Sequence, residues 1–226
     1  MGLTQKQLAR MMDFSAVRAE HNADDIRKLA DGARRYGAIA VFALPAWTPT
    51  LVEMLADESH IAIGGVIGFP SGGDSTAAKV FQARELIGMG CSELDMVINI
   101  GRLRSAEHPA VEDDVRAVVE AAEGTPLKVI LECGLLSDDQ IRQGCDICVR
   151  SGASFVKTGT GWADCTRIAE YISLMHECVG DAIGIKAAGG IRDLATVLDL
   201  YERGARRFGV GAGSAANILQ ACPDAS

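Results

Sequence analysis

Long runs of basic residues and long apolar runs are both missing from this sequence of 226 residues. Thirty acidic residues outnumber twenty-two basic ones, and the resulting formal net charge of -8 disfavours binding to nucleic acid or to an anionic membrane surface. No apolar stretch is long enough to span a bilayer, and the first residues, M-G-L-T-Q-K-Q-L-A-R-M-M, contain no apolar core followed by a cleavage site. We therefore expect a cytoplasmic protein with no nucleic-acid partner and no membrane partner.

Zinc-binding patterns of cysteine and histidine are missing as well. The seven cysteines are an odd number scattered through apolar segments, which is typical of reduced thiols that serve as small core residues. Cys145 and Cys148 form one C-D-I-C pair inside a predicted helix, without a second pair or a histidine at the spacing of a zinc ligand. We expect no metal and no other cofactor.

No linker, internal repeat or low-complexity segment interrupts the chain, so we expect a single domain over residues 1–226. With 48% hydrophobic and 23% charged residues the chain can bury a large core. Apolar segments that suit strands alternate with helical segments throughout. The predicted strands are residues 11–15, 38–44, 61–69, 93–100, 127–133, 153–157, 183–186 and 207–210. The predicted helices are residues 4–10, 26–36, 48–56, 76–89, 110–123, 138–150, 164–178, 194–203 and a last one from 214.

Eight apolar strands separated by helices predict an α/β fold of the (β/α)8 TIM barrel type, because such strands form a parallel sheet that is covered on all sides. An open doubly wound sheet is the alternative, but no G-x-G-x-x-G fingerprint follows the first clear strand. A barrel gathers the C-terminal ends of its strands around one pocket. Residues that are distant in sequence can therefore meet there.

Two lysines end neighbouring predicted strands. The stretch A-S-F-V-K-T-G-T-G-W ends a strand on Lys157, and A-I-G-I-K-A-A-G-G carries Lys186 at the same relative place. Desolvation and a nearby positive charge both favour a free amine over an ammonium, and a free amine can attack a carbonyl group. The alternative is that each lysine extends to water. Asp95, in E-L-D-M-V-I-N-I, alternates onto a face from which it can reach the lysines, either as a structural ion pair or as an acid-base partner.

Glycines cluster after the last two predicted strands. Gly189 and Gly190 precede a helix capped by Asp193, while Gly209 and Gly211 lead into the last helix. Backbone N–H groups and two helix N-termini can then face one ligand, which predicts an anion site where barrels commonly bind phosphate. Glycine turns that simply close loops are the alternative.

Four motifs along the chain carry a family resemblance. They are V-I-G-F-P-S-G at 66–72, E-L-D-M-V-I-N-I-G at 93–101, S-F-V-K-T-G-T-G at 154–161 and I-K-A-A-G-G-I-R at 185–192. In this order the sequence resembles 2-deoxyribose-5-phosphate aldolase over most of the chain from residue 61 onward. The resemblance implies a class I aldolase, which forms a Schiff base without a metal and reversibly cleaves 2-deoxy-D-ribose 5-phosphate into acetaldehyde and D-glyceraldehyde 3-phosphate.

The resemblance also implies roles for individual residues. Lys157 matches the Schiff-base lysine, Lys186 the neighbouring lysine, and Asp95 the carboxylate of the proton relay. The remaining candidates are expected to bind the substrate or its phosphate: Asp13, Ser15, Thr158, Thr160, Gly161, Gly189, Gly190, Gly209 and Gly211. A homodimer and a part in the catabolism of carbohydrates and deoxyribonucleotides are consistent with the same resemblance.

The sequence also departs from the family near the expected pocket. The early D-H-T-L-L-K-P segment reads D-F-S-A-V-R-A, so Ser15 stands in the place of a threonine, and C-V-N-P has become F-A-L-P at 42–45. Gly159 replaces a serine, and Gly211 and Ala212 replace a serine pair in the last phosphate loop. Two alternatives therefore stay open: a lysine-dependent aldolase for a different aldehyde or keto substrate, phosphorylated or unphosphorylated, and a catalytically silent barrel that acts as a binding protein.

Overall fold

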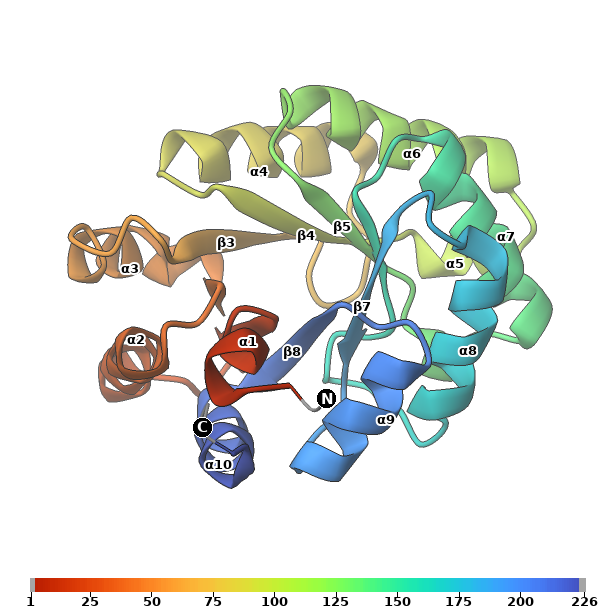
Figure 1. The fold of residues 1–226 in the computed structure, drawn as a ribbon. Helices are drawn as coiled ribbons and strands as arrows, with labels where there is room; N and C mark the ends of the chain where they lie inside the picture. Colours follow the sequence, from red (N-terminus) through yellow and green to blue (C-terminus); the bar gives the residue numbers. More distant parts are fainter. Residues whose placement is uncertain (1–2, 224–226) are drawn as a thin grey trace.

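Eight short apolar segments form a closed parallel barrel in the computed structural model, which describes residues 3–223. Each strand pairs with the next along the chain, and β8 pairs with β1 to close the ring. Figure 1 shows helices ranged around the outside of these strands. The strands are β1 (Met12–Ala16), β2 (Ala40–Ala43), β3 (Ala62–Ile67), β4 (Glu93–Val97), β5 (Leu127–Ile130), β6 (Phe155–Lys157), β7 (Gly184–Ala188) and β8 (Arg207–Gly211).

Helices follow the strands and bury one apolar face against them. In α2, for example, Ile26, Leu29 and Ala33 recur at helical spacing and are fully buried. The α-helices are α1 (Gln5–Ala9), α2 (Ala23–Tyr36), α3 (Thr48–Met54), α4 (Thr76–Gly88), α5 (Ile100–Arg104), α6 (His108–Ala121), α7 (Asp138–Arg150), α8 (Ile168–Val179), α9 (Leu194–Glu202) and α10 (Ala212–Ala221). The predicted α/β barrel is confirmed, and the doubly wound alternative is wrong.

Local sequence signals set several helix ends. Asn22 accepts hydrogen bonds from the backbone N–H groups of Asp24 and Asp25, and Asp25 bonds back to Asn22, which forms a capping box at the start of α2. The same helix ends at Gly37, whose left-handed backbone (φ 66°) suits a residue without a Cβ atom. These signals are readable in the sequence because they depend on neighbours within four residues.

The barrel has one closed end and one open end. Arg10, just after α1, donates hydrogen bonds from Nη1 to Ala38 O and His60 O, which lie just before β2 and β3. This places α1 across the end of the barrel where the strands begin. The opposite end, where the strands finish, is left for the loops that carry the candidate site.

The structure corrects some of the predicted boundaries. The strand expected over 93–100 ends at Val97, because Asn99 accepts a hydrogen bond from Arg102 N and starts α5, a helix that the sequence pattern did not predict. The strand expected over 127–133 ends at Ile130 and is followed by a 3-10 turn, Cys133–Leu135. β7 instead continues to Ala188, two residues beyond the expected end.

Within residues 3–223, no helix combines the length and apolarity that crossing a bilayer requires.

Candidate active site

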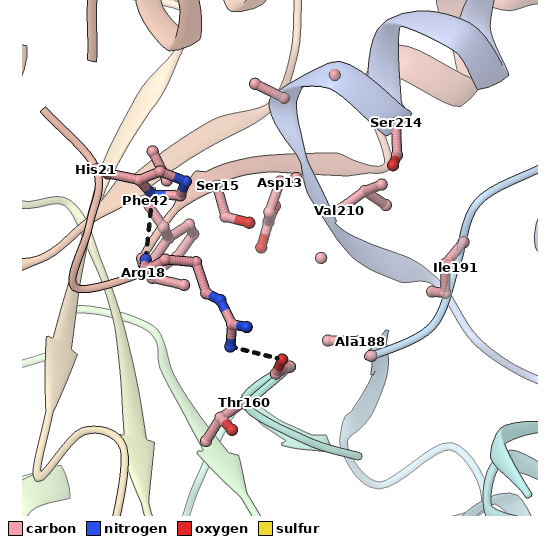
Figure 2. Close-up of a pocket in the computed structure, with 18 of the residues that line it drawn as sticks. Asp13, Ser15, Arg18, His21, Phe42, Thr160, Ala188, Ile191, Val210 and Ser214 are labelled. Atoms are coloured by element: carbon pink, nitrogen blue, oxygen red, sulfur yellow. Dashed lines mark hydrogen bonds between the residues drawn. The ribbon is translucent and has the colours of Figure 1, made fainter. Parts of the chain in front are cut away.

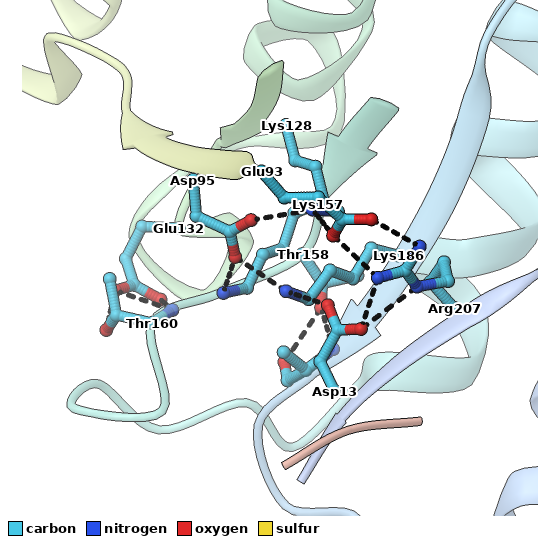
Figure 3. Close-up of polar contacts among 11 residues, drawn as sticks. Asp13, Glu93, Asp95, Lys128, Glu132, Lys157, Thr158, Thr160, Lys186 and Arg207 are labelled. Atoms are coloured by element: carbon cyan, nitrogen blue, oxygen red, sulfur yellow. Dashed lines mark hydrogen bonds and ion pairs between the residues drawn. The ribbon is translucent and has the colours of Figure 1, made fainter. Parts of the chain in front are cut away.

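Three of the predicted residues meet inside the barrel. Lys157 ends β6, and its register partner in β7 is Lys186, while Asp95 lies in β4. Asp95 Oδ2 accepts hydrogen bonds from Lys157 Nζ at 2.8 Å and from Lys186 Nζ at 2.6 Å. Figure 3 shows this one carboxylate between the two amines. The alternative that the lysines extend to water is wrong, since Lys157 is 7% exposed and Lys186 is 1% exposed.

A second layer of charged groups lies beside these three. Lys128 Nζ is 2.6 Å from Glu93 Oε2 and 3.3 Å from Asp95 Oδ1. Arg207 Nη2 is 2.7 Å from Glu93 Oε2, and its Nε donates to Asp13 Oδ1 at 3.0 Å. Figure 3 shows these residues joined to the pair of amines in one network.

Asp13 completes the network at Lys186. Its Oδ2 is 2.6 Å from Lys186 Nζ, so Lys186 pairs with both Asp13 and Asp95. Among the described residues, the only carboxylate that pairs with Lys157 is Asp95. The interior network therefore holds three lysines and one arginine against three carboxylates, namely Lys128, Lys157, Lys186 and Arg207 against Asp13, Glu93 and Asp95. If all are ionised, one positive charge is in excess.

The surrounding cations keep the buried carboxylates ionised. Burial opposes the charged form of Asp95, but Lys157, Lys186 and Lys128 outweigh it and hold the pKa of Asp95 well below its ordinary value. Burial also opposes the charged form of Asp13, and Lys186, Lys128 and Arg207 lower the pKa of Asp13 in the same way. At neutral pH both groups are carboxylates that can accept a proton.

An aromatic ring covers part of the network. The Phe42 ring centroid is 4.2 Å from Lys186 Nζ and 5.0 Å from Lys128 Nζ, so the ring face contributes cation–π attraction to both. Gly64 in β3 makes room for this ring, because a Cβ atom at that position would lie 2.2 Å from it. Phe42 comes from the F-A-L-P departure noted in the sequence.

Four residues of the network, Asp13, Asp95, Lys157 and Lys186, form the floor of a cavity of about 750 Å³ at the C-terminal ends of the strands. Such a volume suits a small metabolite. Figure 2 shows Arg18, His21 and Thr160 on its walls, with Ala188, Ile191 and Ser214 on the side opposite Arg18. Of the predicted residues, the following line it: Asp13, Ser15, Asp95, Lys157, Thr160, Gly161, Lys186, Gly189, Gly190, Gly209 and Gly211.

Thr158 lies beside the cavity and is not among the residues that line it. Its hydroxyl donates to Ala188 O at 2.8 Å and accepts from Ala188 N at 2.9 Å. The side chain is fully buried and joins the end of β6 to the end of β7. It thus holds the strands that carry the two lysines.

Glu132 is a site residue that the sequence pattern did not single out. It follows β5 in a left-handed conformation (φ 59°) and accepts hydrogen bonds from the backbone N–H of Thr160 at 3.2 Å and from the Thr160 hydroxyl. Burial raises the pKa of Glu132, and the bonds from Thr160 partly offset that effect. A Cβ atom at Gly159 would lie 2.8 Å from Glu132 Oε1, so the glycine that replaces the family's serine leaves room for this carboxylate.

Lys128, Arg207 and Phe42 were also missed as site residues. Lys128 had a readable signal, because a lysine inside the apolar strand L-K-V-I suggests an interior partner.

Within residues 3–223, no three side chains of the histidine, cysteine, aspartate and glutamate types lie where they could hold a metal ion.

Comparison with known proteins gives the family. Residues 5–220 match the family model described as DeoC/LacD family aldolase. The chain is 44% identical over 221 residues to a deoxyribose-phosphate aldolase of Klebsiella pneumoniae, covering 97% of this chain and 89% of that protein. It is also 44% identical to deoxyribose-phosphate aldolase 1 of Bacillus licheniformis over 209 residues, covering 92% of this chain and 93% of that one.

Solved structures agree with the sequence comparison. A putative deoxyribose-phosphate aldolase from Coccidioides immitis superposes with a TM-score of 0.91 at 32% identity, covering 97% of this chain and 87% of that one. The deoxyribose phosphate aldolase from Aeropyrum pernix, described as tetrameric, gives a TM-score of 0.87 at 28% identity, with 96% and 91% covered. The chain therefore belongs to the DeoC/LacD aldolase family.

Proposed function

We propose that this protein is a class I aldolase that reversibly cleaves 2-deoxy-D-ribose 5-phosphate to acetaldehyde and D-glyceraldehyde 3-phosphate. The relatives at 44% identity carry the name of this activity. The single observation that supports the chemistry is the carboxylate of Asp95, which contacts both Lys157 Nζ and Lys186 Nζ on the floor of the cavity. In this proposal Lys157 is the nucleophile, Asp95 relays protons, and Lys186 supplies a neighbouring cation.

The choice of Lys157 as the nucleophile rests on charge balance. The interior network has one cation more than it has carboxylates, so its cations share carboxylates unequally. Lys186 has two carboxylates and the Phe42 ring to stabilise its charge. Within the described chain, Asp95 is the only carboxylate at ion-pair distance from Lys157, with Glu132 acting on its charge from farther away, and Lys157 is the more exposed of the two lysines. Lys157 is therefore the amine with fewer charged partners and the more open of the two to a carbonyl group in the cavity.

The reaction follows from these positions. The Lys157 amine adds to the aldehyde carbon of the substrate, and loss of water gives an iminium ion. The bond between C2 and C3 of the sugar then breaks, and its electrons form the C1–C2 double bond of an enamine on Lys157. The C3 hydroxyl loses its proton in this step, and C3 becomes the aldehyde carbon of glyceraldehyde 3-phosphate. Asp95 passes protons between the hydroxyl, the leaving water and the enamine carbon. Protonation of the enamine and hydrolysis release acetaldehyde and restore the amine.

The walls of the cavity suit the rest of the substrate. Gly189 and Gly190 have φ values of 102° and 76°, and the start of α10 after Gly211 has no side-chain cap. Their backbone N–H groups can donate to a phosphate. Thr160 and Ser15 supply hydroxyls at the cavity wall.

Borohydride trapping tests the nucleophile directly. In the presence of acetaldehyde, reduction should leave a stable two-carbon adduct on Lys157, detected by peptide mass spectrometry. Lys157→Ala should abolish both the adduct and the release of acetaldehyde from 2-deoxyribose 5-phosphate. Lys6→Ala, at an exposed position of α1, is the matched control and should retain both. An adduct on another lysine, or full activity of Lys157→Ala, contradicts the proposal.

The departure from the family at Gly211 and Ala212 supports a second candidate substrate, an unphosphorylated aldehyde. Gly211 and Ala212 line the cavity without the hydroxyls of the family's serine pair, which removes side-chain donors to a phosphate. A panel of phosphorylated and unphosphorylated aldehydes, assayed under the same conditions, ranks the substrates. A catalytically silent barrel is disfavoured by the intact network around Asp95.

The cellular setting is part of the same proposal. We place the protein in the cytoplasm, in the catabolism of carbohydrates and deoxyribonucleotides, with no nucleic-acid partner. Buried cysteines that are not in disulfides, including Cys133, Cys145 and Cys148, suit a reducing compartment. We also propose a homodimer, which the family resemblance implies, although the relative from Aeropyrum pernix is described as tetrameric. Light scattering of the purified protein measures its molar mass and so the number of subunits in the assembly.

A further inference from the structure

The mouth of the cavity is locally basic in a chain whose formal net charge is -8. Arg18, Lys28 and Arg192 line it together with the carboxylate of Asp25, and the carboxylate of Glu20 lies beside Arg18. The carboxylates on the cavity floor are already paired within the interior network. A positive rim around a concave site raises the local concentration of anionic ligands.

Arg18 differs from the other two cations in being held in place. Its guanidinium carbon lies 5.2 Å from the centroid of the Trp162 ring, and Nη1 donates to Gly161 O at 3.3 Å. Trp162 is itself fixed, because its Nε1 donates to Val17 O at 3.0 Å and its ring meets Phe69 edge to face. Lys28, by contrast, is 77% exposed.

The guanidinium also has donors to spare. Within the described chain, Gly161 O accepts its hydrogen bond, and Glu20 Oε1 lies 3.8 Å from Nε. An arginine has five N–H groups in a planar fork that matches a phosphate. Figure 2 shows the Arg18 side chain reaching into the cavity from the β1–α2 loop, with Ile191 and Ser214 on the other side.

We propose that Arg18 is a specificity residue that binds the phosphate of the sugar substrate, opposite the glycine loops that follow β7 and β8. This inference rests on the proposed aldolase function and adds the residue that selects phosphorylated over unphosphorylated substrates. Arg18 would supply a charged donor from the opposite side of the cavity, in a site where Gly211 and Ala212 supply no side-chain hydroxyl.

Arg18→Gln tests the proposal with two substrates. For 2-deoxyribose 5-phosphate, KM should rise about 10- to 100-fold with kcat little changed, which is the effect of losing a charge-assisted hydrogen bond to the phosphate. For unphosphorylated 2-deoxyribose, kcat/KM should stay within about twofold, because that substrate presents no anion. Arg18→Lys keeps the charge and should lie between the wild type and Arg18→Gln.

Arg102→Gln is the matched control, since Arg102 is an exposed arginine on α5 outside the cavity. It should leave both substrates unchanged. Equal losses for both substrates in Arg18→Gln would show that Arg18 only supports the loop carrying Trp162, and no loss for either would show that it does not meet the phosphate. Circular dichroism confirms that each variant is folded.

Titration with inorganic phosphate separates this inference from the proposed function. The wild type should bind phosphate by calorimetry, and Arg18→Gln should bind it at least about tenfold more weakly. Phosphate binding that depends on Arg18 in a protein that cleaves no sugar would overturn the aldolase proposal and leave the anion site standing. Sugar cleavage with phosphate affinity independent of Arg18 would overturn the inference alone.

Discussion

Asp95 is the residue on which the interior charges depend, because it is fully buried and lies within 3.3 Å of three ammonium groups. Asp95→Asn keeps the shape of the side chain and removes the charge. We expect kcat to fall about 10²- to 10⁴-fold through loss of the proton relay. We also expect the free energy of unfolding to fall by about 3–5 kcal/mol, because buried cations lose their counter-ion. Steady-state kinetics and urea unfolding measure the two effects.

A second buried ion pair supplies the control. Lys79 Nζ is 2.6 Å from Asp114 Oδ2, and both side chains are almost fully buried between α4 and α6, away from the cavity. Asp114→Asn should lower stability by a similar amount while kcat stays near the wild-type value. If Asp114→Asn lowers kcat as much as Asp95→Asn does, the loss of activity follows from instability and the proton relay is unsupported.

At the scale of elements, a close contact between β2 and β3 holds the aromatic ring over the lysines. The Gly64→Ala methyl group would lie 2.2 Å from Phe42, and the ring cannot move without disturbing Lys186 and Lys128. We expect Gly64→Ala to lower the free energy of unfolding by about 1–3 kcal/mol and to reduce kcat. Thermal and urea unfolding measure the first effect.

Gly88 is the matched position for this substitution. It lies at the end of α4, with no neighbouring atom within 4 Å of an added Cβ. Gly88→Ala should raise the free energy of unfolding by about 0.4–1 kcal/mol, because alanine restricts the unfolded chain more than glycine does. A Gly64→Ala protein as stable as Gly88→Ala would mean that Phe42 has room to move, contrary to the packing described.

Helix and strand types were largely predictable from the sequence, whereas several strand ends were not. The apolar runs predicted all eight strands, because a strand that is buried on both faces is made almost entirely of apolar residues. The predicted end of β4 was wrong. Ile98 is apolar and follows Val97 directly, so hydrophobicity alone suggests a longer strand, whereas Asn99 already caps the next helix.

For the whole molecule, the lowered pKa values predict sensitivity to acid. The pKa values of Asp13 and Asp95 are lower in the folded protein than in the unfolded chain, so the unfolded chain binds more protons as pH falls. Their stabilising contribution is fully present above the unfolded value of about 3.9 and is lost as pH falls further, through the folded values. Glu132 has the opposite sign, since its raised pKa favours the folded state at low pH and that contribution is lost as pH rises.

Urea unfolding between pH 7 and pH 3 measures the balance of these groups. We expect the free energy of unfolding to fall most steeply below about pH 4, where the unfolded aspartates take up protons. Asp95→Asn removes one of the two groups and should show a shallower decline. An equally steep decline in the variant would mean that Asp95 is not ionised in the folded protein.

The amino-acid pattern was enough to predict the barrel, the candidate lysines and Asp95, because strand alternation, helix caps and four short motifs are local or near-local features. The tertiary structure decided which groups share a charge network, since Lys128, Arg207 and Glu93 meet only when β4, β5 and β8 close into a ring. It also decided the place of Arg18, whose loop is fixed by Trp162, 144 positions further along the chain. Electrostatic coupling depends on distance in space, and a linear pattern does not contain that distance until the chain has folded.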